Sequence, residues 1–165
     1  MADLDRNELE SKMWKSISET HTGMLGSVGP NADHMQPMTA FCEPETRTIW
    51  FFIRRDNDLL RTIGEQPRAM FCLVGKDHHL FACLGGELSE RYDAERIDKF
   101  WNPVVAAWYP QGKDSPELTL LRFDVADAQL WVSQKGPIGF AWEIAKANAT
   151  HELPDAGERA HLRFN

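Results

Sequence analysis

The chain has 165 residues and a formal net charge of -7 at pH 7. It carries 25 acidic against 18 basic residues and no run of about five Lys and Arg, which argues against binding to nucleic acid or to an anionic membrane surface. A chain of this length is expected to form one domain, covering residues 1–165.

The sequence also gives expectations about membrane segments, disulfides and metal sites. The N-terminus lacks an apolar leader, and there is no apolar run of the roughly 18 residues needed to span a membrane. The three cysteines form an odd set without C-x-x-C spacing, which favours reduced thiols over a disulfide framework. A cytoplasmic protein is therefore expected. The six histidines do not form H-x-x-x-H or H-E-x-x-H, so no metal site is predicted.

The N-terminal half is predicted to combine a helix with hairpin-forming strands. Residues 7–19 favour a helix capped by Asp5 or Asn7, because apolar side chains recur every four positions along one face. The elements that follow, in order, are strands at 21–28, 35–41 and 48–54, with 43–47 as a hairpin loop, and a short helix that begins after Asp56 or Asn57 and ends near Gly64.

The second half is also rich in strands. The expected elements, in order, are strands at 69–74 and 80–88 joined by a turn at 75–78, two helices capped by Asp93 and Asn102, strands at 118–125 and 128–132, an apolar helix over 137–148, and a polar tail. Short strands joined by turns, without long strand–helix–strand alternation, favour a barrel or a sandwich.

The strand at 48–54 is apolar on both faces. Alternation places Ile49, Phe51 and Ile53 on one face, and Trp50, Phe52 and Arg54 on the other. A strand buried on both sides of a small antiparallel sheet needs a second covering body. That body could be a packed helix, a partner subunit or a flat ligand.

Polar residues follow this strand at once. Arg54 and Arg55 precede Asp56 and Asn57, where the short helix is expected to begin. Guanidinium groups and free helix N–H groups suit an anion such as a phosphate monoester. The alternative is a solvated turn in which arginine and aspartate pair with each other.

Motifs for covalent or dinucleotide chemistry are missing from the sequence. There is no G-x-S-x-G and no cysteine that the sequence pairs with a histidine, so no catalytic side chain is predicted. The glycines at 23, 26 and 29 follow a helix and have the wrong spacing for a G-x-G-x-x-G fingerprint.

Four segments in order carry a family resemblance: "QPMTA" at 36–40, "IWFF" at 49–52, "FWNPVVAAWYPQGKDSPELTLLRF" at 100–123 and "DAQLW" at 127–131. With them the chain resembles the general stress proteins of the pyridoxamine 5'-phosphate oxidase-like, FMN-binding split-barrel superfamily. The resemblance implies a mainly β fold, a six-stranded antiparallel split β-barrel over about 20–133 with flanking helices, followed by a C-terminal helix and tail at 137–165. It also implies a homodimer with FMN between the subunits.

The resemblance further implies a set of cofactor-binding residues: Gln36, Met38, Thr39, Phe52, Ile53, Arg54, Arg55, Asn57 and Leu59, with Trp131 contributed by the partner subunit. His34, just before the first of these segments, is a further candidate as a ligand-facing strand end, and the alternative for it is an ordinary surface histidine. Gln36 and Leu59 stand where relatives often carry Arg and Lys that hold the phosphate. These two substitutions are expected to weaken phosphate binding unless Arg54, Arg55 or Arg61 replaces the missing cations.

The function predicted from this resemblance is that of an FMN-binding general stress protein. If the protein is an enzyme, the expected activity is that of a flavin-dependent oxidoreductase with an unknown substrate. The alternative is a non-enzymatic split-barrel module that binds another anionic small molecule. Pyridoxamine 5'-phosphate oxidase activity is not expected, because the Arg and His motif that holds its substrate is not evident in the C-terminal "GERAHLRFN".

Overall fold

The computed structural model describes residues 5–133, 135–155 and 157–164. Within these ranges the helices are α1 (Arg6–Thr20), α2 (Asp58–Glu65), α3 (Ala94–Phe100), α4 (Pro103–Trp108) and α5 (Pro137–Thr150). The strands are β1 (Thr22–Ser27), β2 (Gln36–Thr39), β3 (Phe41–Glu43), β4 (Thr48–Arg54), β5 (Arg68–Val74), β6 (Leu80–Glu90), β7 (Leu118–Val132) and β8 (Glu158–Arg163). None of these helices has the length and apolar composition needed to cross a membrane.

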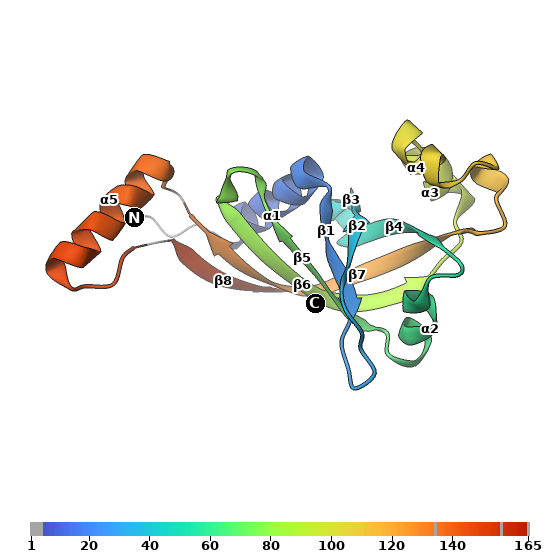
Figure 1. Ribbon diagram of the computed structural model, residues 1–165, viewed down its shortest axis with the longest axis horizontal. Helices are drawn as coiled ribbons and strands as arrows, with labels where there is room; N and C mark the ends of the chain where they lie inside the picture. The colour runs from blue at the N-terminus through green and yellow to red at the C-terminus, as the bar shows by residue number, and fades with distance from the viewer. Residues whose placement is uncertain (1–4, 134, 156, 165) are drawn as a thin grey trace.

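The strands form one curled antiparallel sheet with the order β2-β1-β5-β6-β7-β4-β3, and β8 pairs with β7 (Figure 1). Long β6 and β7 pass through its centre, while α3 and α4 lie at one end of the molecule and α5 projects from the other. The mainly β, split-barrel class is thus confirmed. Within the described residues the sheet has eight strands, where six were expected from the sequence, and it includes the short β3 beside β4 and β8 beside β7.

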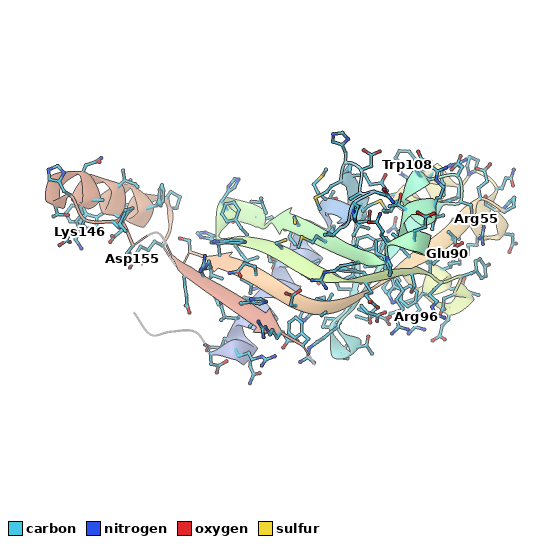
Figure 2. The ribbon with its side chains drawn as sticks, turned by 90° about the horizontal axis from the view of Figure 1, so that it is seen from below. Arg55, Glu90, Arg96, Trp108, Lys146 and Asp155 are labelled. Atoms are coloured by element: carbon cyan, nitrogen blue, oxygen red, sulfur yellow. The ribbon has the colours of Figure 1, made fainter. Side chains whose placement is uncertain are left out.

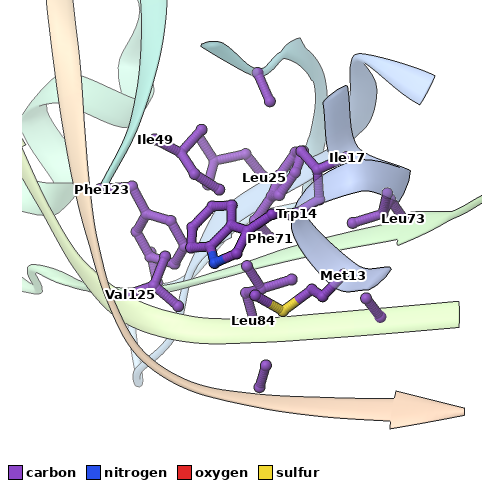
Figure 3. Close-up of a cluster of buried hydrophobic side chains, with 14 of the residues drawn as sticks. Met13, Trp14, Ile17, Leu25, Ile49, Phe71, Leu73, Leu84, Phe123 and Val125 are labelled. Carbon is purple, nitrogen blue, oxygen red and sulfur yellow. The ribbon is translucent and has the colours of Figure 1, made fainter. Parts of the chain in front are cut away.

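Helix α1 closes the inside of the barrel. Its apolar face places Met13, Trp14 and Ile17 against sheet side chains such as Phe71 and Phe123 (Figure 3). All five side chains are buried, and full burial of a large apolar side chain contributes about 1.5–3 kcal/mol. The helix begins as the sequence predicts, because Asp5 Oδ1 accepts from the Glu8 N–H at 2.8 Å and the Glu8 carboxylate accepts from the Asp5 N–H.

Two strand predictions were wrong in detail. The expected strand at 35–41 is split at Ala40, so that β2 pairs with β1 whereas β3 pairs with β4. The two strands expected at 118–125 and 128–132 are one continuous strand, β7, in which Ala126 is an extra residue opposite the step from Gly85 to Gly86 of β6, so that a β-bulge keeps both halves paired.

The polar tail contains a strand that was not predicted from the sequence, β8 at residues 158–163. Ala160 and Leu162 alternate with charged or polar side chains, and both pack against the barrel core. Leu162 lies opposite Ala128 of β7. Alternation of period two is the mark of a half-buried strand, and here it spans only two apolar residues.

The second apolar face of β4 is covered by helices of the same chain. Trp50 is buried in a cluster with Ile97 of α3, Val105 of α4 and Tyr109, and Phe52 packs against its edge. The covering body that the sequence required on this face is therefore the α3–α4 segment.

A partly buried carboxylate links this segment to the sheet. Glu43 of β3, whose side chain is 13% exposed, accepts from Arg96 Nε at 3.1 Å and from Lys99 Nζ at 2.8 Å, and also from the Trp50 indole. Burial alone would raise the pKa of Glu43, but the hydrogen bonds from Lys99, Arg96 and Trp50 outweigh it and lower the pKa below 4.5.

Glu43→Gln is expected to lower the free energy of unfolding by about 1–3 kcal/mol at neutral pH, because two cations lose a charged acceptor. A carboxylate with a lowered folded-state pKa stabilises above the unfolded value of 4.5, and this contribution is lost as pH falls through the folded pKa. Urea unfolding of both proteins should therefore show curves that converge as pH falls below 4.5. The exposed neighbour Glu45, changed to Gln, is the control; equal effects at both positions would contradict the role of Glu43.

Candidate functional site

A cavity of about 580 Å³ lies between the β1–β2 hairpin, the loop that joins its strands, and helix α2. Its size is within the range of small-molecule sites. The residues that line it are Leu25, Ser27, Asn31, Asp33, His34, Gln36, Asp56, Asn57, Asp58, Leu59, Arg61, Thr62 and Glu65.

Four residues predicted for the site meet in this cavity: His34, Gln36, Asn57 and Leu59. Gln36 and Asn57 exchange two amide hydrogen bonds, each of 3.3 Å, which join β2 to the start of α2. The Asn57 oxygen also accepts from the Leu59 N–H at 2.9 Å and caps the helix. The N-terminus of α2 is therefore held in a fixed position beside the cavity.

Carboxylates outnumber cations in the lining. Asp33, Asp56, Asp58 and Glu65 line the cavity, whereas Arg61 is the one Lys or Arg among the described lining residues. Arg61 pairs with Asp58 at 3.0 Å. Hydrogen bonds from the His34 backbone and then its ring lower the pKa of Asp33, so this carboxylate is ionised at neutral pH.

The two arginines after β4 lie outside this lining. Arg54 pairs with Asp56 at 3.3 Å and with Glu117. Arg55 bonds Glu90 at 2.7 Å, and Figure 2 shows this pair beside the barrel. The alternative of an arginine turn satisfied by neighbouring carboxylates is therefore what the structure shows, with partners from β6 and from the loop before β7.

The other predicted residues occupy different places on the barrel. Ile53 is buried inside it and Met38 packs against the same core. Phe52 packs edge-to-face on Phe41 and Trp101, and Thr39 is exposed. These four do not line the cavity in the described chain.

Trp131 lies on the outer face of β7, opposite Phe81 of β6. Its side chain is 45% exposed and Phe81 is 42% exposed. Trp131 is not among the residues that line the cavity of its own chain. Its predicted contact with a ligand therefore needs a second subunit.

The cavity fits a phosphate group in part. The amides of Gln36 and Asn57 and the N-terminus of the eight-residue helix α2 offer donors to an anion. The four carboxylates repel a dianion, and among the described lining residues Arg61 is the one Lys or Arg whose charge offsets this repulsion. The residues present can hold the polar end of a ligand, but with weaker attraction for a phosphate than a site rich in arginine and lysine.

The sequence prediction omitted most of the polar lining. Asp56 and Asp58 stand in the predicted segment but were not assigned to the site, and Arg61 was named only as a replacement for the missing cations. Asp33 lies in the β1–β2 loop and Glu65 at the end of α2. Only the density of acidic residues at 56–58 could have indicated the negative lining beforehand.

Comparison with known proteins agrees with this fold. Residues 8–155 match the family model described as "Pyridoxamine 5'-phosphate oxidase like". The comparison with curated proteins found no match.

Solved structures with the same fold include three from bacterial stress-protein families. A candidate general stress protein 26 from Jannaschia sp. is 31% identical, with a TM-score of 0.79 over 96% of this chain and 99% of that one. A candidate general stress family protein from Xanthomonas campestris is 41% identical, with a TM-score of 0.73 over 81% and 93% of the two chains. The general stress FMN/FAD binding protein from Xanthomonas citri is 42% identical, with a TM-score of 0.71 over 79% and 92%.

Because the family model covers nearly the whole chain and a relative of 31% identity aligns with 96% of it, the protein belongs to the pyridoxamine 5'-phosphate oxidase-like family.

Proposed function

We propose that this protein is a cytoplasmic, single-domain, FMN-binding general stress protein that acts as a homodimer. The observation that carries the proposal is the cavity beside α2, where the predicted site residues His34, Gln36, Asn57 and Leu59 come together. The relative from Xanthomonas citri, named as an FMN/FAD binding protein, supports a flavin as the ligand.

The residues of the cavity would hold the phosphate end of the cofactor. Gln36 and Asn57 supply amide groups, and α2 supplies its N-terminal N–H groups. The bound flavin would supply hydride or electron transfer, and an oxidoreductase activity on an unknown substrate would follow from it. The protein would then orient the flavin and set the electrostatic potential around it.

Binding can be measured directly. Titration of the purified protein with FMN, followed by quenching of flavin fluorescence, is expected to saturate at one flavin per chain. Thermal stability should rise with ligand, by about 2.7 kcal/mol at 100 times Kd. If neither FMN nor riboflavin binds up to about 1 mM, the proposed function is refuted.

A binding module for a different anionic metabolite remains the second candidate. The observations that favour it are Gln36 and Leu59 at positions where cations were expected, and the acidic lining around Arg61. A thermal-shift screen in which another phosphorylated compound stabilises the protein and FMN does not would select this candidate.

The charge of the lining gives a prediction about cofactor preference. Asp58→Asn removes a carboxylate from the cavity and releases Arg61 from its 3.0 Å ion pair. FMN affinity is expected to rise about 3- to 10-fold in dilute buffer, because low ionic strength screens the interaction between these charges and the phosphate only weakly. Riboflavin, which has no phosphate, should bind with unchanged affinity.

Asp98→Asn is the matched control, since it removes the same charge from α3, outside the cavity. A rise in riboflavin affinity equal to that for FMN would show that Asp58 does not act through the phosphate.

The homodimer is supported by large apolar side chains that the single chain leaves exposed. They occur on α5, on α4 and on the outer sheet face: Ile138, Phe140, Trp142, Val104, Trp108, Met24, Phe81 and Trp131. Figure 2 shows Trp108 of α4 and Lys146 of α5 at opposite ends of the molecule. Exposed apolar groups that lie close together, such as the three on α5, are characteristic of protein–protein contact surfaces.

A further inference from the structure

Two cysteines face each other across neighbouring strands, outside the cavity. Cys72 of β5 lies directly opposite Cys83 of β6, and their sulfur atoms are 3.1 Å apart. Both are free thiols and both are half-buried on the outer face of the sheet. The third cysteine, Cys42, packs instead against the barrel core.

The backbone at this pair has the geometry that a disulfide requires. The Gly75 N–H donates to the Leu80 carbonyl at 2.7 Å, so these opposed residues form a hydrogen-bonded pair at the end of the β5–β6 ladder. Hydrogen-bonded and non-bonded pairs alternate in an antiparallel ladder, and Cys72 lies three residues before Gly75. Cys72 and Cys83 are therefore a non-hydrogen-bonded pair, with Cα atoms about 4.5 Å apart. Disulfides span Cα distances of about 4.4–6.8 Å.

The chemical surroundings of the pair are soft and apolar. The Met70 sulfur lies 3.7 Å from the Cys83 sulfur. Met24 of β1 stands opposite Cys72 on its other side. Two cysteines that served only as small core residues would not need opposed positions on a half-exposed sheet face with their sulfur atoms in contact.

We propose that Cys72 and Cys83 form a dithiol redox site that exchanges electrons with small-molecule disulfides. One cysteine thiolate attacks a sulfur of the disulfide, whose S–S bond breaks and releases one thiolate that takes up a proton. The second cysteine thiolate then attacks the mixed disulfide and releases the other small thiol. In the balance, two protein thiols are oxidised to one disulfide by two electrons, and one small disulfide is reduced to two thiols.

The environment sets the speed of this exchange. Burial, followed by the nearby Cys83 thiol, raises the pKa of Cys72 to about 12, so the reactive thiolate is scarce at neutral pH. The pair also shares its sheet face with Phe81 and Trp131, which the proposed partner subunit would approach. The exchange is consequently expected to be slow, and a measurement at equilibrium tests the site better than a rate does.

The full-length protein can be brought to equilibrium in buffers of reduced and oxidised glutathione at mildly alkaline pH, then quenched with acid. Alkylation and intact mass should show that the three free thiols fall to one as the buffer becomes oxidising, with the loss of two hydrogens. Peptide mapping should join Cys72 to Cys83 and find Cys42 alkylated.

Single variants separate a dithiol site from ordinary thiols. Cys42→Ser should retain the internal disulfide with the same midpoint. Cys72→Ser and Cys83→Ser should instead accumulate one glutathione on the remaining cysteine of the pair, because no second thiol resolves the mixed disulfide.

The proposal is overturned if the unaltered protein keeps three thiols in fully oxidised glutathione. It is overturned equally if Cys72 and Cys83 each retain glutathione, or if a link involves Cys42. These outcomes are independent of flavin binding, so they do not decide the proposed function.

Discussion

A chain that carries Ile138→Asp and Trp142→Asp is expected to remain monomeric at concentrations at which the unaltered protein is a dimer. These residues are four apart on α5, so they share one face, and they are 87% and 68% exposed. Among the fourteen residues of α5, all of them described, none is buried. An apolar helix whose residues all remain unburied in its own chain is a strong candidate for contact with a second copy.

The expected size of the effect follows from burial. Each large apolar side chain that is buried on association contributes about 1.5–3 kcal/mol, and a two-fold dimer contains each position twice. Loss of these contacts, with carboxylates placed in the interface, should weaken the dimer by at least about 1,000-fold.

Analytical ultracentrifugation over a range of concentrations provides the measurement. Asn148→Asp with Ala149→Asp adds the same charge to exposed positions of the same helix and should leave the dimer intact. An unaltered protein that is monomeric throughout would refute the homodimer, whereas a dimer that tolerates both aspartates would show that α5 is not its contact.

Local signals in the sequence were sufficient to predict most of the fold. The run of β-branched and aromatic residues at 48–54 predicts β4 with its observed bounds, and the caps Asp5, Asn57, Asp93 and Asn102 begin helices as expected. In each case the physical cause lies within a few residues of its effect, either a run of residues that favour strands or a side chain that accepts from a nearby N–H. Strand β8 was missed because it owes its place to pairing with β7, about 30 residues earlier in the chain.

In the candidate site, too, local sequence signals predicted some residues, whereas contacts between distant segments could not be predicted. Gln36 and Asn57 were predicted from family-like segments, and the structure joins them through their amides. The partners of Arg54 and Arg55 could not be predicted, because Glu117 and Glu90 are remote in sequence and reach the arginines only through the sheet. The negative charge of the cavity likewise depends on how the β1–β2 loop lies over α2.

Gly86→Ala is expected to destabilise the fold more than any other change considered for the sheet. Gly86 lies on β6 opposite the bulge that β7 makes at Ala126, where the register of the two strands shifts, and it is buried. A Cβ at this position would overlap the Asp124 carbonyl oxygen and lie 3.0 Å from the Phe123 ring, both in the neighbouring strand. Neither can move without disturbing the ladder of β7, which is bonded on both sides to β6 and β4.

Overpacking of this kind costs about 1–3 kcal/mol, and a clash with backbone lies at the upper end of that range. The midpoint of thermal unfolding should fall by roughly 5–10 °C for a domain of this size. Gly64→Ala is the matched control, because no described atom lies within 4 Å of the added Cβ and its position in α2 favours alanine by up to about 1 kcal/mol. Opposite shifts for the two variants would show that the bulge requires glycine for space, since the same methyl group is added in both. Equal shifts would mean that β6 and β7 can adjust their register at Gly86, and that the curl of the barrel does not depend on this residue.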